Sequence, residues 1–162
     1  MLVSNTSTLV LLTKVGCLEE FIMISPTIEI PNQVMEEALI DKESYYARFI
    51  QKLIQENKIK VVVVKENKIE NIMEHFRLDK GEAATYVLFD NKKHKAILTD
   101  DGELIKLCKL EKIDFICAMA VIIRLFEKKV LSRERALDRL RDLNEIGRYS
   151  KELYEKFKWE VK

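Results

Sequence analysis

Short apolar runs alternate with longer amphipathic segments along most of this chain. The β-branched run IKVVVV at 59–64 is the clearest of the segments that predict buried strands. The others lie at 2–4, 27–30, 96–99 and 114–117. Strands that are separated by helices connect in parallel and carry helices on both faces of the sheet. The pattern therefore predicts an α/β fold with a mostly parallel central sheet.

Helical periodicity accounts for the segments between and after these runs. The expected helices span 6–14, 18–24, 32–40, 43–56, 67–77, 80–91, 103–110, 119–129, 132–145 and 150–160. A Ser or Thr is expected to cap the first of them, and Ser132 and Ser150 stand where the last two need N-caps. Because no Gly/Ser linker interrupts the 162 residues, we expect one domain over 1–162. Its core would end near 118, and a helical C-terminal part would follow.

Composition excludes several classes of nucleotide-binding protein. The chain has only 4 glycines, too dispersed for a GxGxxG or GxxxxGK[ST] loop. Rossmann dinucleotide binding, P-loop NTPases and Gly-rich-loop kinases are therefore excluded. Because the formal net charge is only +1, a charge-driven partner must meet a local patch.

Cysteine usage and hydropathy indicate a cytoplasmic protein that does not cross a membrane. Cys17, Cys108 and Cys117 form no C-x-x-C pair, so we expect free thiols in a reduced compartment. The longest apolar run covers 115–123, whereas a membrane span needs roughly twenty residues.

Oxygen-bearing side chains cluster where the predicted strands end or the following helices begin. They are Asn5, Glu37, Glu82, Asp100 and Asp101. Ligands of parallel sheets gather at the carboxyl ends of the strands, so we expect these five side chains to converge. Carboxylates brought together repel one another and raise a pKa unless a cation lies between them. An all-oxygen ligand set favours Mg²⁺ or Mn²⁺.

Each of these residues also has a purely structural explanation. Asn5 suits an N-cap, and Asp100 with Asp101 suits a turn and a cap. Glu82 favours a helix N-terminus through its charge, and Glu37 is ordinary on a helix surface. Their joint placement, rather than any one residue, favours a metal site.

Four short motifs follow one another along the chain. They read N-T-S-T-L at 5–9, P-N-Q-V-M-E-E at 31–37, G-E-A at 81–83 and L-T-D-D at 98–101. In this order they resemble the PIN-domain family of metal-dependent ribonucleases, specifically its small VapC-like members. The matching family motifs are D-T-S-P-L, P-x-x-V-x-x-E, G-E and D-D. The resemblance covers about residues 1–126, with a weaker echo in the Tyr149–Phe157 stretch, and implies the PIN fold, a Rossmann-like three-layer sandwich.

The resemblance also implies an activity, site residues and partners. The family's acidic catalytic residues, which hold Mg²⁺ or Mn²⁺, correspond here to Glu37, Glu82 and Asp101. Thr6 and Ser7 correspond to hydroxyl residues beside the first acid and would position a ligand or a phosphate. RNA is the implied substrate. VapC-like members usually pair with a small antitoxin, so a protein of that kind is an expected partner.

The first motif departs from the family at Asn5, which stands in place of an aspartate. An amide oxygen ligates Mg²⁺ without adding negative charge, so metal affinity should fall. The chain is then a weakened nuclease or, alternatively, an inactive PIN-fold module that binds RNA or a protein. A receiver is less compatible because its pattern, an Asp ending a central strand with a Lys ending a later one, is not visible, and an aspartyl phosphatase is less compatible because no D-x-D follows the first strand.

Two further features suggest contacts outside the acidic site. The basic stretch N-K-K-H-K at 91–95 makes Lys92 and Lys93 candidates for positioning the RNA backbone. The helix expected at 119–129 is apolar around most of its circumference, which requires cover on two sides. A second copy in a homodimer, or a central place in the core, would supply that cover.

Overall fold

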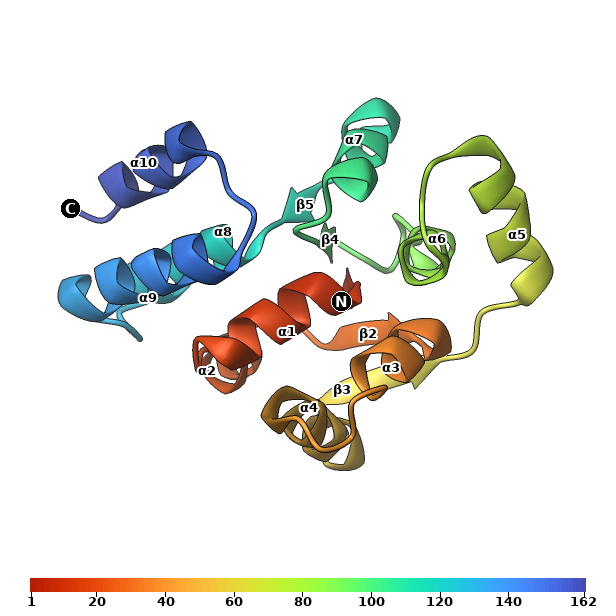
Figure 1. The fold of residues 1–162 in the computed structure, drawn as a ribbon, viewed down its shortest axis with the longest axis horizontal. Helices are drawn as coiled ribbons and strands as arrows, with labels where there is room; N and C mark the ends of the chain where they lie inside the picture. The colour runs from red at the N-terminus through yellow and green to blue at the C-terminus, as the bar shows by residue number, and fades with distance from the viewer.

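A parallel sheet forms the centre of the computed structural model, which describes residues 1–162 (Figure 1). Its five strands lie in the order β3-β2-β1-β4-β5. Their bounds are β1 Leu2–Ser4, β2 Ile28–Pro31, β3 Ile59–Val62, β4 Ala96–Leu98 and β5 Phe115–Ile116. Every pair of neighbours is parallel, and Leu2 aligns with both Ile28 and Ala96. This arrangement confirms the predicted α/β class.

Helices occupy the connections and the C-terminal part. They are α1 Thr6–Lys14, α2 Leu18–Ile24, α3 Asn32–Ala38, α4 Tyr45–Gln55, α5 Glu66–His75, α6 Lys80–Leu88, α7 Gly102–Glu111, α8 Ala118–Glu127, α9 Arg133–Ile146 and α10 Lys151–Glu160. Each predicted helix and strand is present, with ends that differ by a few residues. None of these helices is long and apolar enough to cross a membrane.

The end of β3 shows why such bounds shift. The strand predicted at 59–64 stops at Val62, and Val63 is 83% exposed. The Val64 N–H donates to Asn32 Oδ1 at 3.0 Å, and its carbonyl accepts from Gln33 Nε2 at 3.3 Å. Side chains of α3 therefore replace the neighbouring strand as partners of this backbone.

Two apolar clusters, one on each face of the sheet, make the three layers. In β4, Ala96 and Leu98 belong to the larger cluster, whereas Ile97 between them belongs to the smaller one. Successive strand residues point to opposite faces, which produces this alternation. The larger cluster packs under α1–α4, α8 and α9, and the smaller one under α5–α7.

Helix α8 is covered by its own chain. It contacts α1, α2, α9 and α10, and the C-terminal helices α8–α10 gather at one end of the molecule, far from α5 (Figure 1). Its buried side chains are Ala118, Met119, Val121, Ile122, Ile123 and Leu125. The apolar circumference is thus explained by a central core position and does not call for a second copy. The homodimer stays a prediction, which light scattering tests.

Helix α10 depends on its cap because it contributes no buried residue. Ser150 Oγ accepts from the Leu153 N–H at 3.1 Å, as its N-cap position predicts. We expect Ser150→Ala to lower the free energy of unfolding by about 1 kcal/mol, measured as a shift of the urea midpoint. Ser150→Asp, which retains a capping acceptor, is the control. Equal midpoints for the alanine variant and the wild type would contradict a stabilising cap.

Candidate active site

Parallel strands bring the predicted site residues to one edge of the sheet. Asn5 follows β1, and Asp101 follows β4 and caps α7. Asn5 Nδ2 donates to Thr99 Oγ1 at 2.9 Å, and the Asp101 N–H donates to the same oxygen at 3.1 Å. Thr6, the first residue of α1, donates to Glu37 Oε2 on α3 at 2.8 Å. Hydrogen bonds thus link three segments that are far apart in the sequence at this edge.

Glu37 lies directly over Gly81. A Cβ at Gly81 would stand 2.3 Å from Glu37 Oε1, closer than any real contact of that kind, so only glycine leaves room. Burial raises the pKa of the Glu37 carboxyl, and the bonds from the Thr6 hydroxyl and the Gly81 N–H offset part of the increase. The G-E motif therefore contributes in two ways. Gly81 leaves room for the Glu37 carboxylate, and Glu82 is itself one of the acids.

Glu82 and Asp101 form a close acidic pair. The pKa of Glu82 is raised to about 8, first by burial, with a hydrogen bond to the Asp101 side chain and the charges of Asp79 and Asp101 adding to it. The Asp79 N–H, which donates to Glu82 Oε2 at 2.9 Å, lowers it. The increase predicted from like-charge repulsion is present, but desolvation is its largest cause. The raised pKa favours the protonated form of Glu82 near neutral pH.

A capping box fixes Glu82 at the start of α6. The Glu82 N–H donates to Asp79 Oδ1 at 2.8 Å, and Glu82 returns a bond to the Asp79 N–H. Asp79 is a residue that the four motifs do not include, although the D-x-x-E spacing is a known capping signal that predicts it. Asp101 is held in a similar way, because its Oδ1 accepts from the Leu104 N–H at 2.8 Å.

Asn5 is enclosed rather than open to the edge. It is 3% exposed, its Oδ1 accepts from Ser7 Oγ at 2.9 Å, and its Nδ2 binds Thr99. Asn5 occupies the N-cap position of α1, but its side chain makes no capping bond. The predicted Ser or Thr cap is therefore wrong, and Asn5 instead joins β1 to the β4–α7 turn.

Asp100 points away from the acidic pair although it precedes Asp101. Its Oδ1 accepts from Thr8 Oγ1 at 2.6 Å and from the Ala118 N–H at 2.9 Å, and its Oδ2 accepts from the Tyr149 hydroxyl. Burial raises the pKa of Asp100, and these donors oppose the increase. Both carboxylate oxygens are thus engaged by protein donors, which leaves Asp100 unlike the open acids predicted as metal ligands.

The structure does not bring Lys92 and Lys93 to the acids. They lie in the turn that precedes β4, where the Met1 amino group donates to the Lys93 carbonyl at 3.3 Å. The amino ends of parallel strands lie at the edge opposite their carboxyl ends, so this turn is across the sheet from Asp101.

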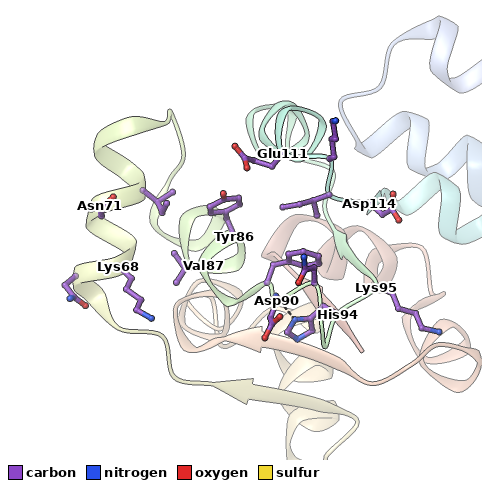
Figure 2. Close-up of a pocket in the computed structure, with 15 residues that line it drawn as sticks. Lys68, Asn71, Tyr86, Val87, Asp90, His94, Lys95, Glu111 and Asp114 are labelled. Carbon is purple, nitrogen blue, oxygen red and sulfur yellow. Dashed lines mark hydrogen bonds between the residues drawn. The ribbon is translucent and has the colours of Figure 1, made fainter.

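An open cavity of about 1130 Å³ lies beside this turn (Figure 2). The segments leading into β4 and β5 line it, together with α5 and α6. Within it, His94 accepts from the Asp90 N–H at its Nδ1, 3.0 Å away, and its Nε2 lies 2.9 Å from Glu29 Oε2. Both ring nitrogens are therefore engaged, and His94 supports the turn.

The carboxyl edge of the sheet where these acids lie, called the acidic edge below, has oxygen donors that fit a hard divalent cation. Glu37, Glu82 and Asp101 supply carboxylate oxygens, which Mg²⁺ and Mn²⁺ prefer. No group of three or more His, Cys, Asp or Glu side chains is assembled closely enough to form a ready metal cluster. Instead, Glu82 has a raised pKa beside Asp101, which favours its protonated form, and Thr6 holds the third carboxylate, Glu37. A cation and this proton would compete for the same oxygens.

Comparison with known proteins adds one finding. A family model described as a PIN domain matches the chain over residues 1–162. The match therefore includes the C-terminal helices, which lie beyond the region of motif resemblance. No curated protein and no solved structure gives a significant match.

Proposed function

The chain belongs to the PIN-domain family, and on this premise we propose that it is a metal-dependent endoribonuclease of the VapC-like branch. The family points to a nuclease-type module that acts on RNA with a divalent metal. The observation that supports the finer proposal is that Glu82 adjoins Asp101 while Glu37 lies against Gly81, the residue before Glu82, at the carboxyl edge of the sheet. An acidic edge with oxygen donors suits phosphodiester hydrolysis.

In this proposal three carboxylates hold Mg²⁺ or Mn²⁺, namely Glu37, Glu82 and Asp101. The bound ion supplies an activated water and charge stabilisation for the phosphodiester. The Thr6 hydroxyl orients Glu37 and the Leu104 N–H orients Asp101, so the chain fixes two of its acids before any ligand binds. Fixed ligands lose less entropy when the ion arrives.

The remaining predicted residues take supporting roles. Ser7 accepts from the Asp100 N–H at 3.2 Å and donates to Asn5, so it orders the acidic edge from within. Asp100 and Asn5 stabilise the turn that carries Asp101. Phosphate positioning by Lys92 and Lys93 is not part of the proposal, because they lie across the sheet.

Cleavage by the wild-type protein tests the function directly. We expect an end-labelled RNA, offered both single-stranded and structured, to be cut internally with Mn²⁺ and left intact with EDTA. Glu37→Gln is the inactive reference, and Glu36→Gln, which changes an exposed neighbour on α3, is the matched control. An RNA that stays intact at every Mn²⁺ concentration while the protein is folded would contradict the proposal.

A second function is favoured by Asn5, whose amide removes one charge from the family's acid set. It is a PIN-fold module that binds RNA or a protein without cutting. A mobility shift of intact RNA, unchanged by Glu37→Gln, would support it.

In either form the proposal includes one domain over 1–162, a cytoplasmic location and a small antitoxin partner, since VapC-like members usually pair with one.

A further inference from the structure

One half-buried carboxylate beside the acidic edge is held from three separate segments. Asp100 receives Thr8 Oγ1 from α1 at 2.6 Å and the Ala118 N–H from the start of α8 at 2.9 Å. The third donor is the hydroxyl of Tyr149, 49 residues further along the chain. Tyr149 lies between α9 and α10, so it is the contact by which the C-terminal extension reaches this edge.

The conformation of the α9–α10 loop places the Tyr149 ring beside Asp100. The loop turns on the side of the C-terminal helices that faces β4 and β5 (Figure 1). A Cβ at Gly147 would stand 2.3 Å from Tyr149 Cε2 and 2.9 Å from the Leu143 carbonyl oxygen, so the ring lies against a bare backbone. Ser150 caps α10 directly after it. Tyr149 is half-buried and packs on the larger apolar cluster.

Asp100 in turn sets the position of the residue that follows it. The Asp100 N–H donates to Ser7 Oγ at 3.2 Å, and the next N–H, of Asp101, donates to Thr99. With the Asp100 side chain held inward, the Asp101 side chain is left on the opposite side, toward Glu82. A shift of Asp100 would therefore rotate Asp101 away from the acidic pair.

We infer that Tyr149 is a positioning residue of the candidate site, holding Asp100 so that the β4–α7 turn presents Asp101. This inference rests on the proposed function for its metal-binding consequence, but the geometry of the turn can be measured without metal. Partners that orient metal ligands typically contribute about 10- to 100-fold in affinity. A role in packing alone would leave the Mn²⁺ affinity unchanged.

The test compares Tyr149→Phe, which keeps the ring and removes the hydroxyl, with Tyr154→Phe. Tyr154 is half-buried on α10 and is not among the donors to Asp100. Titration calorimetry with Mn²⁺ gives affinity, and amide hydrogen exchange gives local stability of the turn. We expect Tyr149→Phe to weaken Mn²⁺ binding about tenfold and to speed exchange at Asp100, Leu104 and Ala118. Tyr154→Phe should change neither.

The outcomes separate this inference from the proposed function. If wild-type protein binds no Mn²⁺ but exchange at the turn speeds up in Tyr149→Phe, the metal function fails and the positioning role stands. If exchange at the turn and Mn²⁺ affinity both match the wild type, the inference is overturned. Exchange that speeds up equally throughout α4 would also overturn it, because that result indicates general destabilisation. Gly147→Ala, which displaces the same ring, should reproduce the Tyr149→Phe pattern.

Discussion

Gly81→Ala is expected to lower RNA cleavage about a hundredfold or more while leaving the fold intact. The added Cβ would stand 2.3 Å from Glu37 Oε1 and 2.5 Å from Oε2, so the carboxylate must leave its place beside Thr6. Loss of one preorganised electrostatic group typically costs about 10²–10³ in rate. The atoms that must move are the end of a flexible side chain, and alanine favours a helix over glycine by about 1 kcal/mol. The free energy of unfolding should therefore stay near the wild-type value or rise.

Gly102→Ala is the matched control for this experiment. Gly102 also lies in the first turn of a helix, but a Cβ there meets nothing within 4 Å. Cleavage rates and urea midpoints of both variants are measured beside Glu37→Gln. Gly81→Ala should match Glu37→Gln in rate and Gly102→Ala in stability. Full activity in Gly81→Ala would mean that Glu37 acts from another position or does not act at all.

The fold could be predicted because its signals are local and repeated. A run such as 59–64 is β-branched throughout, and the segments between strands keep helical spacing, so class and element order follow. The residue at which a strand or helix ends also depends on its hydrogen-bond partners, and the periodicity of the sequence does not reveal these. Asn32 and Gln33, for example, capture the backbone of Val64 and end β3.

The sequence predicts at which edge of the sheet the candidate site residues lie, but not in which direction their side chains point. Residues after parallel strands lie at one edge, where Thr6 donates to Glu37 and Glu82 lies beside Asp101. The same rule, applied to the turn before β4, would have placed Lys93 at the other edge. The charge of the N-K-K-H-K stretch alone carries no information on which edge it occupies.

The direction of a side chain within a turn cannot be predicted from a pattern in the sequence. Asp100 and Asp101 are chemically identical neighbours, and only the donors around them distinguish the inward one from the outward one. One of those donors, Tyr149, comes from the C-terminal extension, where the resemblance is only a weak echo and says nothing of a contact with Asp100. A residue that acts across a long stretch of chain leaves a signal only in the folded structure.

The surroundings of Asn5 are compatible with an aspartate. Ser7 already donates to its Oδ1, and this bond would persist to a carboxylate. Thr99 Oγ1 now accepts from Asn5 Nδ2 and from the Asp101 N–H, and its own hydrogen can turn to donate. Asn5→Asp therefore exchanges donor and acceptor in one bond without leaving a buried polar atom unpaired.

Asn5→Asp is expected to tighten Mn²⁺ binding about tenfold, equivalent to about 1.4 kcal/mol. The new negative charge is added within a buried edge, where a divalent ion is attracted more strongly than in bulk water. Without metal, the same charge stands near Asp101, whose N–H shares Thr99 with residue 5, and should destabilise the fold by repulsion. The variant should therefore melt below the wild type in EDTA and gain more on addition of Mn²⁺.

Paired melting curves in EDTA and in Mn²⁺ measure both effects, and calorimetry gives the affinity itself. Asn91→Asp is the control, because it adds the same charge in the exposed turn before β4, across the sheet from the acids. Its Mn²⁺-induced shift should equal that of the wild type, whereas the shift of Asn5→Asp should be larger. If Asn5→Asp and Asn91→Asp gain equally, Asn5 lies outside the reach of the ion. Its bonds to Ser7 and Thr99 would then be its whole role, and the non-cutting RNA- or protein-binding module would be the better account of this chain.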